Sequence, residues 1–283
     1  MRVGDGPTGD TKKPDVVWLP TPMVVVEEML ALAGVGPEDV LYDLGSGDGR
    51  TVVTAAKRFS VGRAVGVEMR QHLLRRSRKV AHRAGVRSKV HFVRENLFET
   101  DLAGAPVVTL YLLPRLNLKI RPRLLRTLSP GTRIVSHDFG MDDWDPDRTV
   151  RLSAPFGGED GFVVDHKLHL WVVPADVAGR WQWSLYGEVG TRTFDLESGQ
   201  RFKKVHGALI ADGRRYPIRK AKLGGNHIGF TLRKVPGLGT KARFDGRVIG
   251  DRITGTLEIR GGPANAGHGW MAKRVALQPR RRA

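Results

Sequence analysis

Three glycines mark the segment of this sequence that most constrains its fold. Gly45, Gly47 and Gly49 follow a short apolar run at residues 40–44 and precede a segment with helical spacing. Glycines in this position let the backbone turn tightly between a strand and a helix and come close to a ligand. Arg50 stands where a dinucleotide fingerprint requires its third glycine, and the segment lacks the Gly-Lys-Ser/Thr of a phosphate loop. The loop therefore predicts a ligand site of a different kind.

Acidic side chains around this loop indicate the charge of the ligand. Asp43 precedes the loop and Asp48 lies within it, so two carboxylates stand beside the start of the helix. They would repel a pyrophosphate but suit a cationic group. Glu68 follows the next apolar run, where an acid can accept hydrogen bonds from both hydroxyls of a ribose. These residues together predict a site for a nucleoside with an amino-acid arm and no phosphate, which describes S-adenosylmethionine (SAM).

The first half of the chain alternates strands with helices. We expect Thr21, as an N-cap before Pro22, to open the first helix. This order predicts βαβ units in a parallel sheet, with ligands beyond the carboxyl ends of the strands. The expected strands are residues 40–44, 64–68, 89–94, 107–113 and 132–138, the expected helices are residues 22–33, 51–59, 71–84 and 118–128, and a closing hairpin spans residues 149–154 and 162–173 around Gly157–Gly158.

The second half has a different pattern. Turn signals such as Ser198–Gly199 recur at short intervals between short β-rich runs. This pattern predicts an antiparallel meander, closed as a small barrel or folded as a sandwich. The expected strands are residues 181–186, 192–196, 205–210, 228–232, 242–249, 253–259 and 270–275.

The charge balance changes near Pro174. Residues 1–175 contain 25 basic and 21 acidic residues, whereas residues 176–283 contain 22 basic and 8 acidic residues. We therefore expect a flexible N-terminal segment (1–17), an α/β domain (18–175) and a basic β-rich domain (176–283) that ends in the tail Arg280–Arg282. The excess positive charge would attract polyanions such as nucleic acid. It is equally typical of a soluble domain from an arginine-rich proteome.

Other features of the sequence exclude whole classes of protein. The absence of cysteine excludes disulfides, zinc–thiolate sites, cysteine-ligated iron–sulfur clusters and cysteine nucleophiles. No run approaches 18 consecutive apolar residues, so no transmembrane segment is expected. The polar start lacks the apolar centre of a signal peptide, and we expect a cytoplasmic protein, with N-terminal processing left open. The nine histidines show no pair at helical ligand spacing, so no metal site is expected.

The wider pattern resembles the class I SAM-dependent methyltransferases. Residues 20–22, 42–50, 96–98 and 110–114 are similar to archaeal broad-specificity protein-lysine methyltransferases and to ATP synthase c-subunit lysine methyltransferases. The resemblance covers roughly residues 18–140 and does not reach the basic domain. It implies a Rossmann-like, seven-stranded methyltransferase sheet, SAM as the cofactor, and an enzyme that methylates an amine, most simply the lysine of a protein substrate.

The resemblance also implies which residues bind SAM. Many relatives have aspartate where this chain has Asn96, but an amide oxygen can still accept a hydrogen bond from the exocyclic amine of adenine. The methionine arm would be bound by Asp43, Gly45, Ser46 and Gly47, and the ribose by Glu68. The adenine would be flanked by Asn96 and Leu97, and Thr21 would help to close the site.

Three residues at strand ends are candidates for the acceptor side of the site. Tyr111 lies near the end of the expected fourth strand and could orient an amine through its hydroxyl or its ring face. His137 and Asp138 end the fifth strand, where either could accept a proton. Each also fits a purely structural role, Tyr111 in the core and His137 at a strand end.

Three functions remain open from the sequence. The first is a protein-lysine methyltransferase whose basic domain docks an acidic protein. The second is an RNA or other nucleic-acid methyltransferase guided by that domain, although the chain lacks the Asn/Asp-Pro-Pro-Tyr/Phe motif of base-amine methyltransferases. The third is a non-catalytic SAM-binding scaffold, which the intact glycine loop and Glu68 argue against. A small-molecule acceptor also remains open because many acceptors share this fold.

Overall fold

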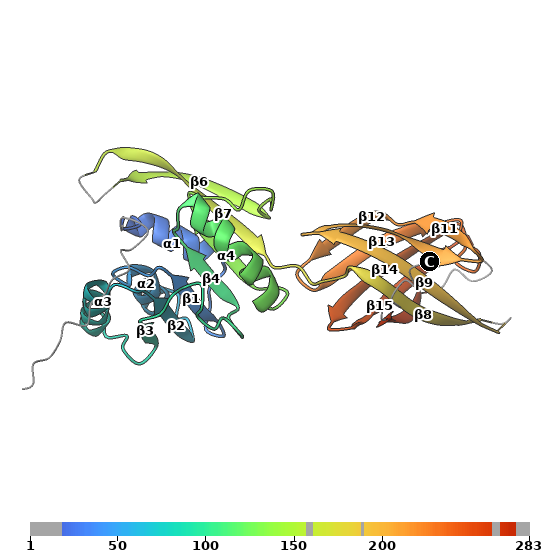
Figure 1. Ribbon diagram of the computed structural model, residues 1–283, viewed down its shortest axis with the longest axis horizontal. Helices are drawn as coiled ribbons and strands as arrows, with labels where there is room; N and C mark the ends of the chain where they lie inside the picture. Colours follow the sequence, from blue (N-terminus) through green and yellow to red (C-terminus); the bar gives the residue numbers. More distant parts are fainter. Residues whose placement is uncertain (1–18, 157–160, 188–189, 262–266, 276–283) are drawn as a thin grey trace, which may run out of the picture. The chain divides into compact units, whose positions relative to one another are not determined.

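A mostly parallel sheet and an antiparallel sheet form the two parts of this protein (Figure 1). The computed structural model describes residues 19–156, 161–187, 190–261 and 267–275. The chain divides into two compact units, one with residues 1–128 and 133–171 and the other with residues 129–132 and 172–283. The expected N-terminal segment 1–17, the hairpin turn at Gly157–Gly158 and the tail Arg280–Arg282 lie outside the described residues.

The first unit contains a seven-stranded sheet with the strand order β3-β2-β1-β4-β5-β7-β6. β1 to β5 pair in parallel, and β6 pairs antiparallel with β7. This arrangement confirms the predicted α/β sheet. None of the described helices is long and apolar enough to cross a membrane. The elements are α1 (Met23–Leu32), β1 (Val40–Leu44), α2 (Arg50–Arg58), β2 (Arg63–Val67), α3 (Gln71–Arg83), β3 (Val90–Val93), β4 (Val107–Leu110), α4 (Pro114–Thr127), β5 (Arg133–His137), β6 (Arg148–Pro155) and β7 (Val163–Val172).

The strand order fixes where a ligand can bind. β1 lies between β2 and β4, so the chain moves outward in one direction from β1 to β3 and in the other direction from β4 onward. The carboxyl end of β1 is therefore the switch point of the sheet, where open α/β sheets bind their ligands. The glycine loop follows β1 directly and lies at this point.

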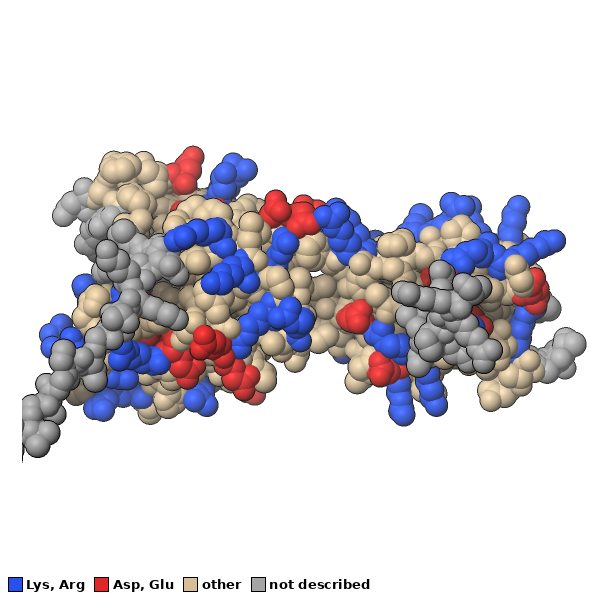
Figure 2. All heavy atoms as spheres, in the orientation of Figure 1, with Lys and Arg blue, Asp and Glu red and all other residues tan. Residues whose placement is uncertain are grey.

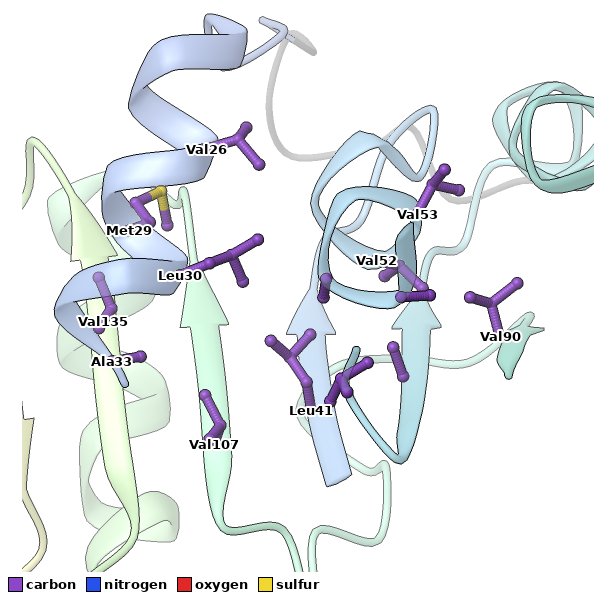
Figure 3. Packing of buried hydrophobic residues seen from close by; sticks show 14 of the residues in the cluster. Val26, Met29, Leu30, Ala33, Leu41, Val52, Val53, Val90, Val107 and Val135 are labelled. Carbon is purple, nitrogen blue, oxygen red and sulfur yellow. The ribbon is translucent and has the colours of Figure 1, made fainter. Parts of the chain in front are cut away.

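Apolar side chains of α1 and α2 cover one face of the central strands. Figure 3 shows Val26 and Leu30 of α1 and Val52 of α2 beside the strands that carry Leu41 and Val107. All five side chains are fully buried. Strands buried in this way read as continuous apolar runs, which is why the sequence predicted them well.

α4 covers the opposite face. Val135 on β5 belongs to the cluster under α1, so its neighbour Ser136 points to the other side of the sheet, where Asn117 Nδ2 donates a hydrogen bond to Ser136 Oγ over 3.2 Å. The helix begins at Pro114 rather than at the predicted residue 118, because proline fits the first turn of a helix and needs no amide hydrogen bond there. The preceding strand β4 ends before Tyr111, which places this residue in the connection.

The first helix also begins differently from the expectation. α1 starts at Met23, and Pro22 occupies the N-cap position without a side-chain capping bond. Thr21 is buried, and its hydroxyl oxygen lies 3.3 Å from Nδ1 of His137. The prediction of Thr21 as an N-cap is therefore wrong, because its hydroxyl contacts the end of β5 instead of the first amides of the helix.

The second unit is a single nine-stranded antiparallel sheet that curls into a nearly closed barrel, which confirms the predicted barrel alternative over the sandwich. Two strands, β11 and β12, were not predicted, because their polar, basic residues show no run of apolar side chains. The strands are β8 (Gly179–Gly187), β9 (Gly190–Arg201), β10 (Lys204–Ala211), β11 (Arg214–Pro217), β12 (Arg219–Gly224), β13 (His227–Arg233), β14 (Lys241–Ile249), β15 (Arg252–Arg260) and β16 (Gly267–Val275).

One predicted turn is absent. β9 continues through Ser198–Gly199 to Arg201, where the sequence predicted a turn. Gly199 pairs with His206 on β10, and the missing Cβ leaves room for the imidazole of His206. The chain turns instead at Phe202, whose φ of 53° is in the left-handed region.

Aromatic residues form the core of the second unit. Phe230 stacks on Phe244 with ring centroids 4.8 Å apart, and Trp270 meets Phe244 edge to face at 5.0 Å. Trp183 contacts the same ring from another strand at 5.4 Å. Phe244 therefore lies at the centre of the cluster and is fully buried.

Truncation of Phe244 tests the importance of this core. Phe244→Ala is expected to lower the free energy of unfolding of the second unit by about 3–5 kcal/mol, because it removes a buried ring and leaves a cavity. Tyr186→Ala is the matched control, since this tyrosine is 87% exposed and its loss should change stability by less than about 0.5 kcal/mol. Urea titration followed by tryptophan fluorescence measures both. Equal effects of the two changes would contradict the assignment of the core.

Candidate functional site

The glycine loop is tied to the neighbouring strand by its backbone. The amides of Gly45 and Ser46 both donate to the carbonyl oxygen of Val67 at the end of β2, each over 2.9 Å. Gly49 adopts a φ of +79° just before α2, and a Cβ there would come within 2.7 Å of the ring of Phe92 and the Cβ of Ser77. Glycine is therefore required at Gly49 both by backbone conformation and by the close approach of β3 and α3.

Asp43 carries a buried carboxylate at the end of β1. Its side chain is 7% exposed, and Oδ1 accepts a hydrogen bond from the hydroxyl of Thr109 over 2.8 Å. Burial raises the pKa of Asp43 from 3.8 to about 6; the charges of Asp48 and Glu68 add to this rise, and hydrogen bonds from Thr109 and Thr51 oppose it. Among the described residues, no lysine or arginine forms an ion pair with Asp43. This carboxylate is suited to a cationic ligand.

The other two acids near the loop are paired with arginine. Oδ2 of Asp48 lies 2.8 Å from the guanidinium of Arg50. Glu68 is buried and accepts hydrogen bonds from the amide of Gly47 over 3.2 Å and from the amide and Nε of Arg70 over 2.9 and 3.0 Å. The arrangement brings Asp43, Asp48 and Glu68 together, but it leaves only Asp43 without a basic partner among them.

Thr21 belongs to the same neighbourhood although it is distant in sequence. Nη1 of Arg50 donates to the carbonyl oxygen of Thr21 over 2.7 Å, which ties the segment before α1 to the glycine loop. The hydroxyl of Thr21 contacts His137, as described above. Thr21 therefore lies between the loop after β1 and the end of β5.

Asn96 and Leu97 lie in the segment after β3. Oδ1 of Asn96 accepts a hydrogen bond from the amide of Phe98 over 3.1 Å, and Nδ2 donates to Glu99 over 2.9 Å. The amide side chain thus stabilises its own turn, and the second lone pair of Oδ1 remains for a ligand amine. Leu97 is half-buried, and its carbonyl oxygen accepts a hydrogen bond from Arg123.

Tyr111, His137 and Phe139 form an aromatic wall at the ends of β4 and β5. The ring of Tyr111 stacks on His137 with centroids 4.0 Å apart and lies parallel to Phe139 at 6.2 Å. Burial lowers the pKa of His137 to about 4; the charge of Asp138 opposes this shift, and His166 adds to it. Burial and the charge of Asp138 raise the pKa of Tyr111. The wall is therefore uncharged at neutral pH.

Asp138 is held at the end of β5 by β7. Its φ of 59° is in the left-handed region, and its amide donates to the carbonyl oxygen of Lys167 over 2.6 Å. Oδ1 of Asp138 in turn accepts a hydrogen bond from the amide of Lys167 over 2.9 Å. Oδ2 lies 3.2 Å from His137 and 3.4 Å from His166. His166 was not predicted as a site residue, because no spacing rule links it to a strand end 28 residues earlier.

Known proteins similar to this chain share the methyltransferase fold and chemistry. The family model for the ANTKMT methyltransferase domain matches residues 43–148. A protein-lysine N-methyltransferase of Saccharolobus islandicus is 41% identical over 160 residues, which are 56% of this chain and 95% of the relative. The Mus musculus lysine N-methyltransferase of the ATP synthase c-subunit is 35% identical over 39% of this chain and 44% of its own length. These findings confirm the resemblance inferred from the sequence.

A solved structure agrees on the cofactor but has a different acceptor in its name. The RNA methyltransferase from Salinibacter ruber, in complex with S-adenosyl-L-homocysteine, is 49% identical over 56% of this chain and 95% of its own, with a TM-score of 0.50. Its product cofactor and the methyltransferase relatives together identify SAM as the cofactor of this chain. The buried Asp43 carboxylate, without a basic partner, fits the ammonium group of such a cofactor.

Removal of the Asp43 charge is expected to stabilise the ligand-free protein. Because the folded chain raises the pKa from 3.8 to about 6, ionised Asp43 costs about 3 kcal/mol of folding stability at neutral pH. This cost is fully present above about pH 6, the pKa of Asp43 in the folded chain. It disappears as the pH falls below 3.8, the ordinary pKa, because Asp43 is then protonated in both the folded and the unfolded chain. Asp43→Asn should therefore raise the free energy of unfolding at neutral pH, and the difference should shrink in acid.

Urea titrations over this pH range measure the effect. Asp101→Asn is the control, because Asp101 is an exposed acid that only accepts a local hydrogen bond from the amide of Ala103. A parent protein more stable than Asp43→Asn at neutral pH would contradict the predicted cost of the buried charge.

Proposed function

We propose that this chain, which belongs to the SAM-dependent methyltransferase family of its archaeal relative, transfers the methyl group of SAM to the side-chain amine of a lysine in a protein. The observation that carries the proposal is the pair of sites at the carboxyl ends of the strands. One is the buried, unpaired carboxylate of Asp43, and the other is the aromatic wall beside the partly exposed Asp138. A cationic cofactor suits the first, and a cationic acceptor side chain suits the second.

The cofactor side follows from the residues around the loop. Asp43 would bind the ammonium group of the methionine arm, and the loop of Gly45, Ser46 and Gly47 would lie against the arm. Glu68 accepts hydrogen bonds from Gly47 and Arg70, and it would accept hydrogen bonds from the ribose hydroxyls in place of those from the Arg70 side chain.

Three more residues would complete the cofactor side. Asn96 and Leu97 would flank the adenine, with the second lone pair of Asn96 Oδ1 accepting from its amine. Thr21, tied to Arg50, would close the site near the end of β5.

The acceptor side explains why an amine fits. When bound, SAM supplies an electrophilic methyl group that an amine lone pair can attack in line with the departing sulfur. Tyr111 and Phe139 present parallel ring faces that would align an alkyl amine and exclude water. Asp138 is 26% exposed and would draw in the ammonium form before it loses its proton. Tyr111, His137 and Asp138 are thus the proposed acceptor-side residues.

An RNA acceptor is the second candidate, because of one specific feature of the barrel. Arg233, Lys241 and Arg260 stand directly opposite one another on β13, β14 and β15, and all three are exposed. Like charges directly opposite in a sheet are destabilising, so such a row favours a polyanionic partner. Figure 2 shows many Lys and Arg side chains on the visible face of this unit, with few acidic ones. A carboxylate at the proposed acceptor wall favours lysine over RNA, whose phosphates it would repel.

The basic second unit would then act as a docking module, for an acidic protein under the first candidate and for RNA under the second. A small-molecule acceptor remains the weaker alternative. The proposed domains are the methyltransferase domain 18–175 and the basic domain 176–283. The expected cytoplasmic location stays a prediction.

The affinity for SAM tests the role of Asp43. Asp43→Asn should weaken SAM binding by about 10- to 150-fold, the loss expected for one hydrogen bond to a charged group. Between about pH 7 and 5 the parent affinity should also fall, because Asp43 becomes protonated near its pKa of about 6 and must lose that proton to bind an ammonium. Isothermal titration calorimetry measures both, and the Asn variant should lack this pH dependence. Unchanged affinity in Asp43→Asn, beside an unchanged Asp101→Asn control, would refute the assignment.

Tritium transfer identifies the acceptor class. Purified protein is incubated with methyl-tritiated SAM and a lysate of the source cells, and the products are treated with protease or with nuclease. We expect the label to be released by protease and to be recovered as methyl-lysine after acid hydrolysis, with far less incorporated by Asp43→Asn at a SAM concentration below the Kd of this variant. Label released by nuclease instead would overturn the lysine proposal and favour the RNA candidate.

A further inference from the structure

Three ligand-type side chains converge at the ends of β5 and β7. Nε2 of His137 lies 2.8 Å from Nδ1 of His166, and Oδ2 of Asp138 lies 3.2 Å from the first nitrogen and 3.4 Å from the second. His137 and His166 are buried to 0% and 1% exposure, whereas Asp138 is 26% exposed. The three atoms thus form a small triangle, with two members inside the protein and one at its surface.

The two backbone hydrogen bonds between Asp138 and Lys167 create this triangle. They place His166, the residue before Lys167, opposite the end of β5. His169, three residues further along β7, is not part of the triangle, since its Nδ1 lies 3.0 Å from the hydroxyl of Thr149 and its ring forms a hydrogen bond with the backbone of Asp138. The convergence therefore depends on the register of β7 and not on a general abundance of histidine.

Two imidazole nitrogens and one carboxylate oxygen face one another in the triangle. Neutral imidazole has one bare nitrogen, and an ionised carboxylate has only acceptor atoms. The two facing nitrogens are only 2.8 Å apart, so there is room for at most one proton between the rings. When His137 donates that proton to His166, Oδ2 of Asp138 and Nδ1 of His166 remain as two acceptor atoms 3.4 Å apart. His166 has no alternative polar contact, because its Nε2 is buried without a hydrogen-bond partner among the described residues. A cation at the centre would satisfy all three atoms together.

We propose that His137, Asp138 and His166 bind a divalent transition-metal ion, with Zn²⁺ as the first candidate. Zinc bonds to histidine nitrogen and carboxylate oxygen are about 2.0–2.2 Å long, so two ligand atoms on one tetrahedral ion lie about 3.3–3.6 Å apart. The separations of 3.2 and 3.4 Å from Oδ2 of Asp138 lie close to this range, whereas the two histidine nitrogens, now 2.8 Å apart, would have to move apart by about half an ångström to share an ion. Two imidazoles and one carboxylate are a donor set that zinc and other first-row ions bind well.

The surrounding hydrogen bonds suit metal ligands. Nδ1 of His137, the nitrogen that faces away from the triangle, lies 3.3 Å from the hydroxyl of Thr21. Oδ1 of Asp138 accepts the amide hydrogen of Lys167. Such outer contacts hold a ligand in one orientation. Two of the three proposed ligands therefore have the support that protein metal sites usually provide.

Three protein ligands leave a fourth position open on zinc, as in catalytic zinc sites. Among the three, only Asp138 reaches the surface, so the open position faces the partly exposed side of the triangle. Tyr111 stacks on the ligand His137, which places the ion behind the aromatic wall of the acceptor side. A bound dication would offset the negative charge of Asp138, so Asp138 would then hold the ion instead of attracting the acceptor ammonium, and metal analysis decides between these two roles.

Metal analysis of the full chain tests the proposal. The protein is prepared without a histidine tag, treated with a chelator, and titrated with Zn²⁺ and with Co²⁺, whose visible absorption reports nitrogen and oxygen coordination. Bound metal is then measured by plasma mass spectrometry. We expect about one equivalent per chain in the parent and in the control His91→Ala, which changes an exposed histidine on β3, and less than about one tenth of an equivalent in His166→Ala.

Circular dichroism and SAM affinity establish that the variants are folded, and Asp138→Asn provides a second ligand variant should His166→Ala fail to fold. Failure of the parent to bind either ion, or retention of a full equivalent by the folded ligand variant, would overturn the proposal. These outcomes are separate from those of the tritium experiment, because metal content does not depend on the acceptor.

Discussion

The buried negative charge of Asp43 is the constraint on which the first unit depends. It lies at the switch point of the sheet, where β1 ends between β2 and β4. Its neighbours are arranged so that it stays unpaired: Asp48 is bound by Arg50, and Glu68 by Arg70. The hydroxyl of Thr109 on β4 orients the carboxylate without neutralising it. The ionised carboxylate thus lowers the stability of the ligand-free fold. A cationic ligand that pairs with it removes this cost, and the free energy regained contributes to the binding of the ligand.

The parts of the site that lie within one strand–turn–helix unit could be predicted from the sequence. The loop of Gly45 to Gly49 and the acids around it are close in the chain, so their spacing already reports their geometry. Strands β1 to β5 were predictable for a related reason, since burial on both faces leaves apolar runs of the right length. The polar strands β11 and β12 were missed because basic residues, and not apolar ones, fill their sequence.

Residues brought together by tertiary structure could not be predicted in this way. The sequence around Thr21 predicts a helix cap, yet the hydroxyl of Thr21 contacts His137, which is 116 residues later in the chain. His166 reads as an ordinary strand residue, and only the pairing of Asp138 with Lys167 reveals that it faces His137. The proposed acceptor side of the site therefore depends on the register between β5 and β7, which no local pattern in the sequence encodes.

The role of Asp43 is tested most directly by the pKa of its carboxyl group. This value can be followed by carbon-13 NMR of the labelled side chain, with Asp43→Asn to assign the signal. We expect a pKa of about 6 in the ligand-free protein and a clearly lower value with SAM bound, because the ammonium of the ligand stabilises the ionised form. A ligand-free pKa near 3.8, or a pKa that SAM leaves unchanged, would contradict the central place given to this carboxylate.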